Sequence, residues 1–164
     1  MRRHRGSVTV TLLFSVALAA SAQQPQQVAP KLKDVVEHMK QYATSHQGLT
    51  SRTPQGVFYF KWIHNPPQGY EKAYFKLGEL NKGMRFLTLN LIRKTSSGVE
   101  LVILNDLDMN SSPEEAYKAT GRTLGDADRA IATSSDKLKT AVTPELLTIW
   151  AAMLDEMKWE LKAD

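Results

Sequence analysis

The strongest regularity in the chain is an alternation of apolar and polar positions near its middle. Leu87, Leu89 and Leu91 alternate with polar residues, a period of two that places one side of a β-strand in a core. After a turn at 95–98, residues 99–104 are apolar at nearly every position, which is typical of a strand covered on both faces. We therefore predict a β-hairpin here, with the rest of the chain arranged around it.

Two further segments before the hairpin have the composition of strands. Residues 57–64 are rich in aromatic and β-branched side chains, and the prolines of 65–69 end the ladder. Residues 70–80 fit either a strand or a helix, because short apolar runs are hard to resolve by period alone. We favour the strand because this segment lies between two strand signals.

Helical spacing of apolar residues appears near both ends of the chain. An apolar stripe follows Pro30 and runs to about residue 43, and a second helix with the widest apolar face follows Thr143 and should bury Trp150 against the sheet. Between them, Ser112 with a proline and a glutamate behind it has the form of a capping box. That signal predicts a short helix ending at Gly121.

A less regular helix covers 124 to about 134. Because the strand signals stand in one block, the pattern favours an α+β fold over a βαβ fold. We expect a three- to four-stranded antiparallel sheet, with an N-terminal helix and two to three C-terminal helices packed mainly on one face.

The N-terminus has the three parts of a secretory signal peptide. Residues 1–5 are basic, residues 8–19 form an apolar run, and small residues at 20–22 suit cleavage after Ala22. A membrane anchor needs about 20 apolar residues, more than this run supplies. A mitochondrial presequence fits less well because the charges stand only at the start. The pattern predicts export to the periplasm or the extracellular medium, with no membrane anchor after cleavage.

Cleavage changes the charge and divides the chain. It would remove three arginines and no acidic residue, so 21 basic residues become 18 against 17 acidic ones, a net charge of +1 instead of +4. A nearly neutral chain lacks the clustered basic charge of a nucleic-acid-binding protein.

We expect a signal peptide at 1–22, a polar leader at 23–29 and a single α+β domain at 30–164. The chain has no cysteine, which excludes thiol catalysis and a lipoprotein anchor.

One run of residues is weakly similar to a calcium-binding loop. Asp106, Asp108 and Asn110 match its opening positions, but Ser111 stands where the loop needs glycine and Tyr117 where it needs a bidentate glutamate. Short polar side chains also form Asx turns. We therefore expect no metal site here.

The other candidate chemistry is sparse. The histidines after the signal peptide (His38, His46 and His64) lack the i, i+4 spacing of a zinc pair, and no nucleophile or cofactor motif occurs. Neighbouring carboxylates such as Asp155 and Glu156 fit solvated helix faces. We expect no cofactor and no catalytic residues.

The remaining candidate is one face of the sheet. If the helices cover the side that carries Phe58, Phe60 and Trp62, a side rich in tyrosine, lysine and asparagine is left for water or a partner. An ordinary solvated sheet face would have the same composition. The candidate binding residues are Tyr59, Lys61, Tyr70, Tyr74, Thr88 and Asn90.

These observations support two functional hypotheses. The first is an exported, non-catalytic protein that binds an unknown protein or small molecule through this face. The alternative is a small exported hydrolase-like enzyme without a recognisable motif. The absence of any nucleophile, metal or cofactor motif favours the first.

Overall fold

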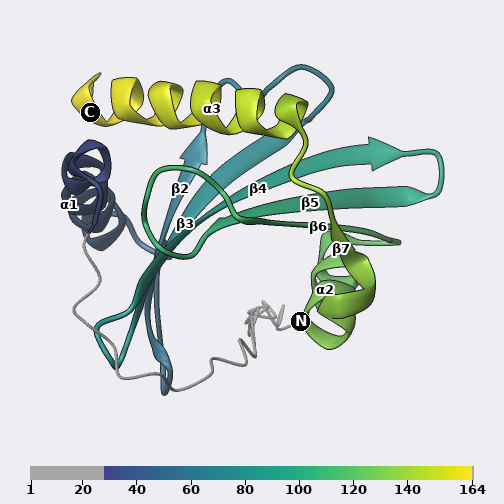
Figure 1. Cartoon of the computed structure of the whole chain (residues 1–164), viewed down its shortest axis with the longest axis horizontal. Coiled ribbons are helices and arrows are strands. Elements are labelled where there is room, and N and C mark those ends of the chain that lie inside the picture. The colour runs from purple at the N-terminus through teal and green to yellow at the C-terminus, as the bar shows by residue number, and fades with distance from the viewer. Residues whose placement is uncertain (1–27, 164) are drawn as a thin grey trace, which may run out of the picture.

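The computed structural model describes residues 28–163 (Figure 1). The predicted signal peptide, its cleavage site and most of the leader lie outside the described residues. Within the described range the elements follow the order α1 (Pro30–Ser45), β1 (Thr50–Thr53), β2 (Gly56–Ile63), β3 (Lys72–Leu80), β4 (Arg85–Thr95), β5 (Gly98–Asp106), β6 (Glu115–Gly121), α2 (Leu124–Leu138), β7 (Lys139–Thr140) and α3 (Pro144–Ala163).

All strands of the described range belong to one antiparallel sheet in which each strand pairs with the next along the chain, from β1 to β7. The predicted hairpin is β4–β5, and residues 72–80 are a strand, as favoured above. The predicted sheet size was wrong, because the sheet has seven strands and not three or four. Two of the additional strands are short and polar: β1 reads Thr-Ser-Arg-Thr and β7 has two residues. Such segments carry no hydrophobic alternation.

Strand β6 replaces the short helix predicted after Ser112. The Glu114 backbone N–H donates to the Asn105 carbonyl at 2.9 Å, and Glu115 pairs with Asn105 as the ladder to β5 begins. Pairing with β5 therefore overrides a local helix-start signal. The capping box that the structure contains lies one element later, where Thr123 and Asp126 cap α2 reciprocally.

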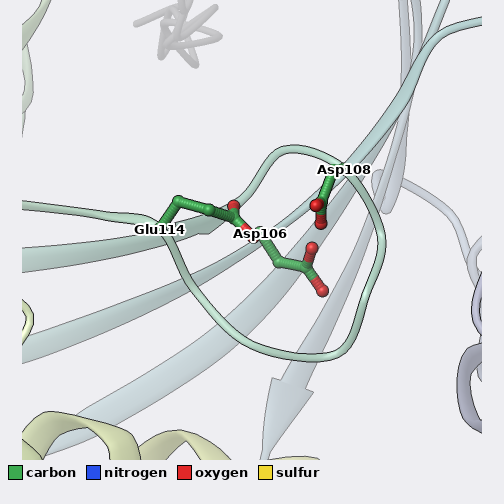
Figure 2. A group of neighbouring side chains, drawn as sticks. All are labelled: Asp106, Asp108 and Glu114. Carbon is green, nitrogen blue, oxygen red and sulfur yellow. The ribbon is translucent and has the colours of Figure 1, made fainter.

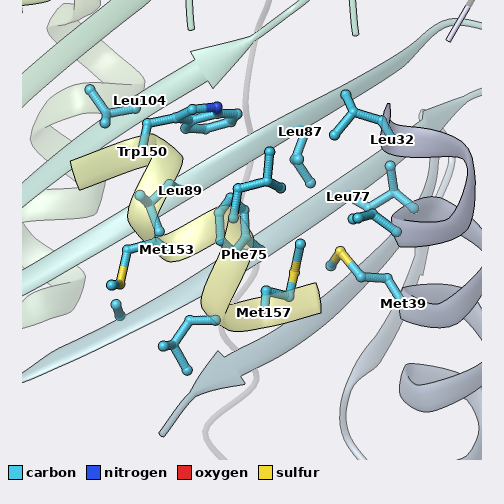
Figure 3. Close-up of a cluster of buried hydrophobic side chains, with 14 of the residues drawn as sticks. Leu32, Met39, Phe75, Leu77, Leu87, Leu89, Leu104, Trp150, Met153 and Met157 are labelled. Atoms are coloured by element: carbon cyan, nitrogen blue, oxygen red, sulfur yellow. The ribbon is translucent and has the colours of Figure 1, made fainter. Parts of the chain in front are cut away.

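The larger core lies between the sheet and the pair α1 and α3 (Figure 1, Figure 3). Trp150 of α3 is buried, as predicted, with its ring edge-on to Phe75 at 5.5 Å between centroids. Its indole N–H donates to the Ser111 carbonyl at 3.0 Å, which satisfies the buried polar atom. The other side chains of this core that Figure 3 labels are Leu32, Met39, Leu77, Leu87, Leu89, Leu104, Met153 and Met157.

A smaller core lies on the opposite face of the sheet, under α2. Ala127 and Ile131 of α2 pack with Leu101, Ile103 and Ala119 of β5 and β6. The helices therefore cover both faces, contrary to the expectation that they pack mainly on one. In the part of the chain that the structure describes, none of the helices is long and apolar enough to span a membrane.

Candidate functional site

The strand register divides the predicted binding residues between the two faces of the sheet. Lys61 pairs with Phe75 across β2 and β3, whereas Trp62 pairs with Tyr74, which in turn pairs with Asn90. Directly paired residues point to the same face. Tyr74, Thr88 and Asn90 therefore lie on the α2 side, together with the aromatic residues of β2. This corrects the predicted grouping, in which those aromatic residues lay under the helices.

The other three predicted residues belong to the α1/α3 side. Lys61 is fully buried, with its ammonium 3.7 Å from the Tyr42 ring centroid and 3.9 Å from a carboxylate oxygen of Glu160. Glu160 also accepts a 2.8 Å hydrogen bond from the His64 backbone N–H. These contacts join β2 to both α1 and α3, which indicates a structural role for Lys61.

Tyr59 and Tyr70 are likewise engaged on that side. The Tyr59 hydroxyl donates to Glu79 at 3.4 Å, and burial together with the Glu79 charge raises the pKa of this tyrosine. Tyr70 packs against the larger core, with the guanidinium of Arg93 5.7 Å from its ring centroid. The structure therefore brings together only Tyr74, Thr88 and Asn90 of the six predicted binding residues.

The α2 side of β2, β3 and β4 carries a group of rings that we call the aromatic face: Phe58, Phe60, Trp62, Tyr74 and Phe86. Trp62 lies 4.8 Å from Tyr74 between centroids, Phe60 lies 6.2 Å from Tyr74, and Phe58 lies 6.3 Å from Phe86. Trp62 is 42% exposed, and the other four are partly buried. Neighbouring rings that remain partly accessible on one face are a common feature of interaction sites.

Gly78 makes room for part of this face. A Cβ atom at position 78 would overlap the Phe86 ring, because the ring packs directly over the glycine backbone. Any larger residue at position 78 would displace Phe86 from its position beside Phe58. The glycine thus has a packing role in the aromatic face.

Polar side chains form the centre of this face. The Lys76 ammonium lies 5.9 Å from the Phe58 centroid and 5.6 Å from that of Phe86, and the side chain is 5% exposed. Beside it, the Thr88 hydroxyl donates to the Asn105 side-chain oxygen at 3.0 Å. Asn90 is 3% exposed, and its side-chain nitrogen has no hydrogen-bond partner among the described residues. A buried amide donor without a partner costs about 1 to 3 kcal/mol.

An acidic residue of α2 faces this polar centre. Burial lowers the pKa of Lys76 to about 8, and the negative charge of Asp128 opposes that shift. Burial also raises the pKa of Asp128, against the attraction of Lys76. The pKa of Tyr74 is raised by burial and by the charge of Asp128. For both members of the Lys76–Asp128 pair, burial outweighs their mutual attraction, so the surroundings disfavour both charges.

A second cluster occupies the loop between β5 and β6 (Figure 2). Asp106, Asp108 and Glu114 have carboxylate oxygens within 4.8 Å of one another. Burial and repulsion among the acids raise the pKa of Asp106 to about 6 and that of Glu114 to about 7. Glu114 was missing from the predicted calcium-like run, because its position after Pro113 had the form of a helix first turn.

The loop itself uses these carboxylates as hydrogen-bond acceptors. Asp106 accepts from the backbone N–H groups of Asn110 and Ser111, at 3.0 and 2.8 Å. Glu114 accepts from the Leu107 N–H at 2.8 Å and from the Asn110 side chain at 3.1 Å. Oxygen ligands at this spacing suit a hard cation such as Ca²⁺. Their hydrogen bonds to the loop, however, are sufficient reason for the acids to gather here.

The chain matches no protein-family model, and comparisons with curated proteins and with solved structures found no significant match. The side chains and their arrangement are therefore the only guide to function.

Proposed function

We propose that this protein is a small exported binding protein that holds an apolar or aromatic ligand on its aromatic face. One observation carries the proposal: rings gather on the β2 side of a sheet face on which α2 packs mainly against β5 and β6. Planar rings around a few polar groups are the usual lining of a small-molecule site. The signal-peptide pattern of the N-terminus supports export.

The arrangement of the rings suits binding more than folding. Phe75, Leu77 and the other apolar side chains of the α1/α3 side are almost fully buried, and they hold the sheet to its helices. Trp62, by contrast, is substantially exposed although its ring packs, tilted, against Tyr74. An exposed tryptophan contributes little to folding and provides a large apolar surface for a ligand.

The proposal is tested by following backbone and indole N–H resonances of the ¹⁵N-labelled protein during titration with 2-naphthamide, an uncharged aromatic probe. Binding should shift resonances of the α2-side residues of β2, β3 and β4, and Trp62→Ala should weaken the affinity about tenfold or more. That loss corresponds to removing one large aromatic contact.

Trp159→Ala is the matched control. Trp159 of α3 is 72% exposed but lies away from the aromatic face, so its removal should leave binding unchanged. Equal losses in both variants, or shifts confined to α1 and α3, would contradict the proposed site.

A further inference from the structure

The polar centre of the aromatic face adds chemical detail to this proposal. Cross-strand pairing places Lys76 opposite Thr88, and Thr88 opposite Asn105. Asn90 lies two residues along β4 from Thr88, and thus on the same face. Side chains from β3, β4 and β5 therefore lie side by side, between the Phe58–Phe86 pair and the Trp62–Tyr74 pair.

The side chains at this centre present donors. Lys76 carries an ammonium group, and the buried Asn90 amide nitrogen has no acceptor within the described residues. Thr88 donates its hydroxyl hydrogen to the Asn105 side-chain oxygen, so the Asn105 oxygen is already used as an acceptor. A ligand that reaches this centre should therefore carry a hydrogen-bond acceptor, and the positive charge of Lys76 favours an anionic one.

Building on the proposed function, we infer that the ligand is a small organic acid, whose carboxylate accepts a hydrogen bond from Asn90 and is attracted by the charge of Lys76, while its apolar body lies on the aromatic face. Lys76 and Asn90 belong to neighbouring cross-strand pairs, Lys76–Thr88 and Tyr74–Asn90, so a carboxylate at the Asn90 amide lies within the field of the ammonium. The Phe58 and Phe86 rings beside Lys76 exclude water and strengthen the ion pair. Asp128 opposes an anion, and attraction to Lys76 and Asn90 must exceed that repulsion.

Two probes of the same shape separate this inference from the binding function. 2-Naphthoate and 2-naphthamide share the aromatic body and differ in charge, so the wild-type protein should bind the acid about tenfold or more tightly. Trp62→Ala should weaken both probes alike, because it removes only aromatic contact. Equal affinity for the two probes would overturn the acid proposal and leave the binding function standing, whereas no shift at the aromatic face with either probe would overturn both.

Variants at the polar centre provide the second test. Lys76→Met removes the charge from a side chain of similar shape, and Asn90→Leu removes the amide but keeps the number of side-chain heavy atoms; each should reduce the preference for the acid at least several-fold. Asn90→Asp, which places a carboxylate against the ligand, should reverse the preference. Unchanged spectra of the free protein establish that each variant folds, and the two-probe comparison in the wild type needs no variant. If the resonances of the aromatic face change with protein concentration alone, a second copy covers the face and the proposal is wrong.

Discussion

The buried ion pair between Lys61 and Glu160 gives a stability prediction that can be worked out from its contacts. Both side chains are more than nine-tenths buried, and the ammonium also lies over the Tyr42 ring. Removing one partner of such a pair costs about 3 to 5 kcal/mol, because the other charge stays in a poorly solvating interior. Glu160→Gln removes the charge but keeps an oxygen to accept from the His64 N–H, so this variant isolates the electrostatic part.

A double-mutant cycle measures the interaction. We expect Glu160→Gln to lower the free energy of unfolding by about 3 kcal/mol, and Lys61→Met by about 3 to 5 kcal/mol because it also loses the cation–π contact. The double variant should lose less than the sum of the two by at least about 1 kcal/mol. Urea unfolding followed by circular dichroism gives each value, and a 3 kcal/mol loss corresponds to a fall in Tm of roughly 12 °C.

The exposed pair formed by Lys94 and Glu71, at 3.5 Å, is the matched control. The same cycle there should give an interaction of less than about 1 kcal/mol, because water and salt screen exposed charges. If the buried cycle is additive within about 0.5 kcal/mol, the pair is not coupled and the reasoning is refuted.

Three further predictions concern other parts of the chain. We predict that the chain is exported and then begins at residue 23, with intact mass showing the loss of 22 residues; an uncleaved N-terminus, or protein retained in the cytoplasm, would contradict the signal peptide. In the folded protein the pKa values of Asp106 and Glu114 lie above the ordinary values of 3.8 and 4.5, so folding favours the protonated carboxyl groups. The free energy of unfolding should therefore fall as pH rises from about 4 to 7. Glu114→Gln should flatten that slope in urea unfolding at a series of pH values, and an unchanged slope would show that the cluster does not titrate in this range. If the loop acids serve only to hold the loop, Ca²⁺ at about 1 mM should leave Tm unchanged. This concentration would saturate a micromolar site and so raise Tm by mass action. A rise in Tm would therefore establish a cation site.

Parts of the fold with strong periodicity could be predicted from the sequence. The β4–β5 hairpin, α1 and α3 follow long apolar patterns, and most of the apolar residues that those patterns identify are buried. The polar Thr88 and Asn90 of β4 are buried as well, which the alternation does not predict. Strand β6 could not be predicted, because Ala116 and Ala119 are its buried residues and alanine favours helix. Its strand conformation comes from pairing with β5, a contact between segments that no local pattern expresses.

The candidate site was harder to predict because it depends on which faces of neighbouring strands coincide. Alternation within β2 correctly separates Phe58, Phe60 and Trp62 from Tyr59 and Lys61, but it does not say which set faces the helices. The more apolar set is the natural choice for the core. The structure instead buries Lys61, because Glu160 and Tyr42 come from distant parts of the chain to surround its ammonium.

The central claim is that the α2 side of β2, β3 and β4 binds a ligand, and titration of the ¹⁵N-labelled protein with 2-naphthoate tests it most directly. We predict saturable shifts of the Trp62 indole and of the Lys76 and Asn90 backbone resonances, which Trp62→Ala weakens and Trp159→Ala does not. Resonances at this face that stay unchanged through the titration would contradict the claim. So would binding that Trp159→Ala weakens and Trp62→Ala does not.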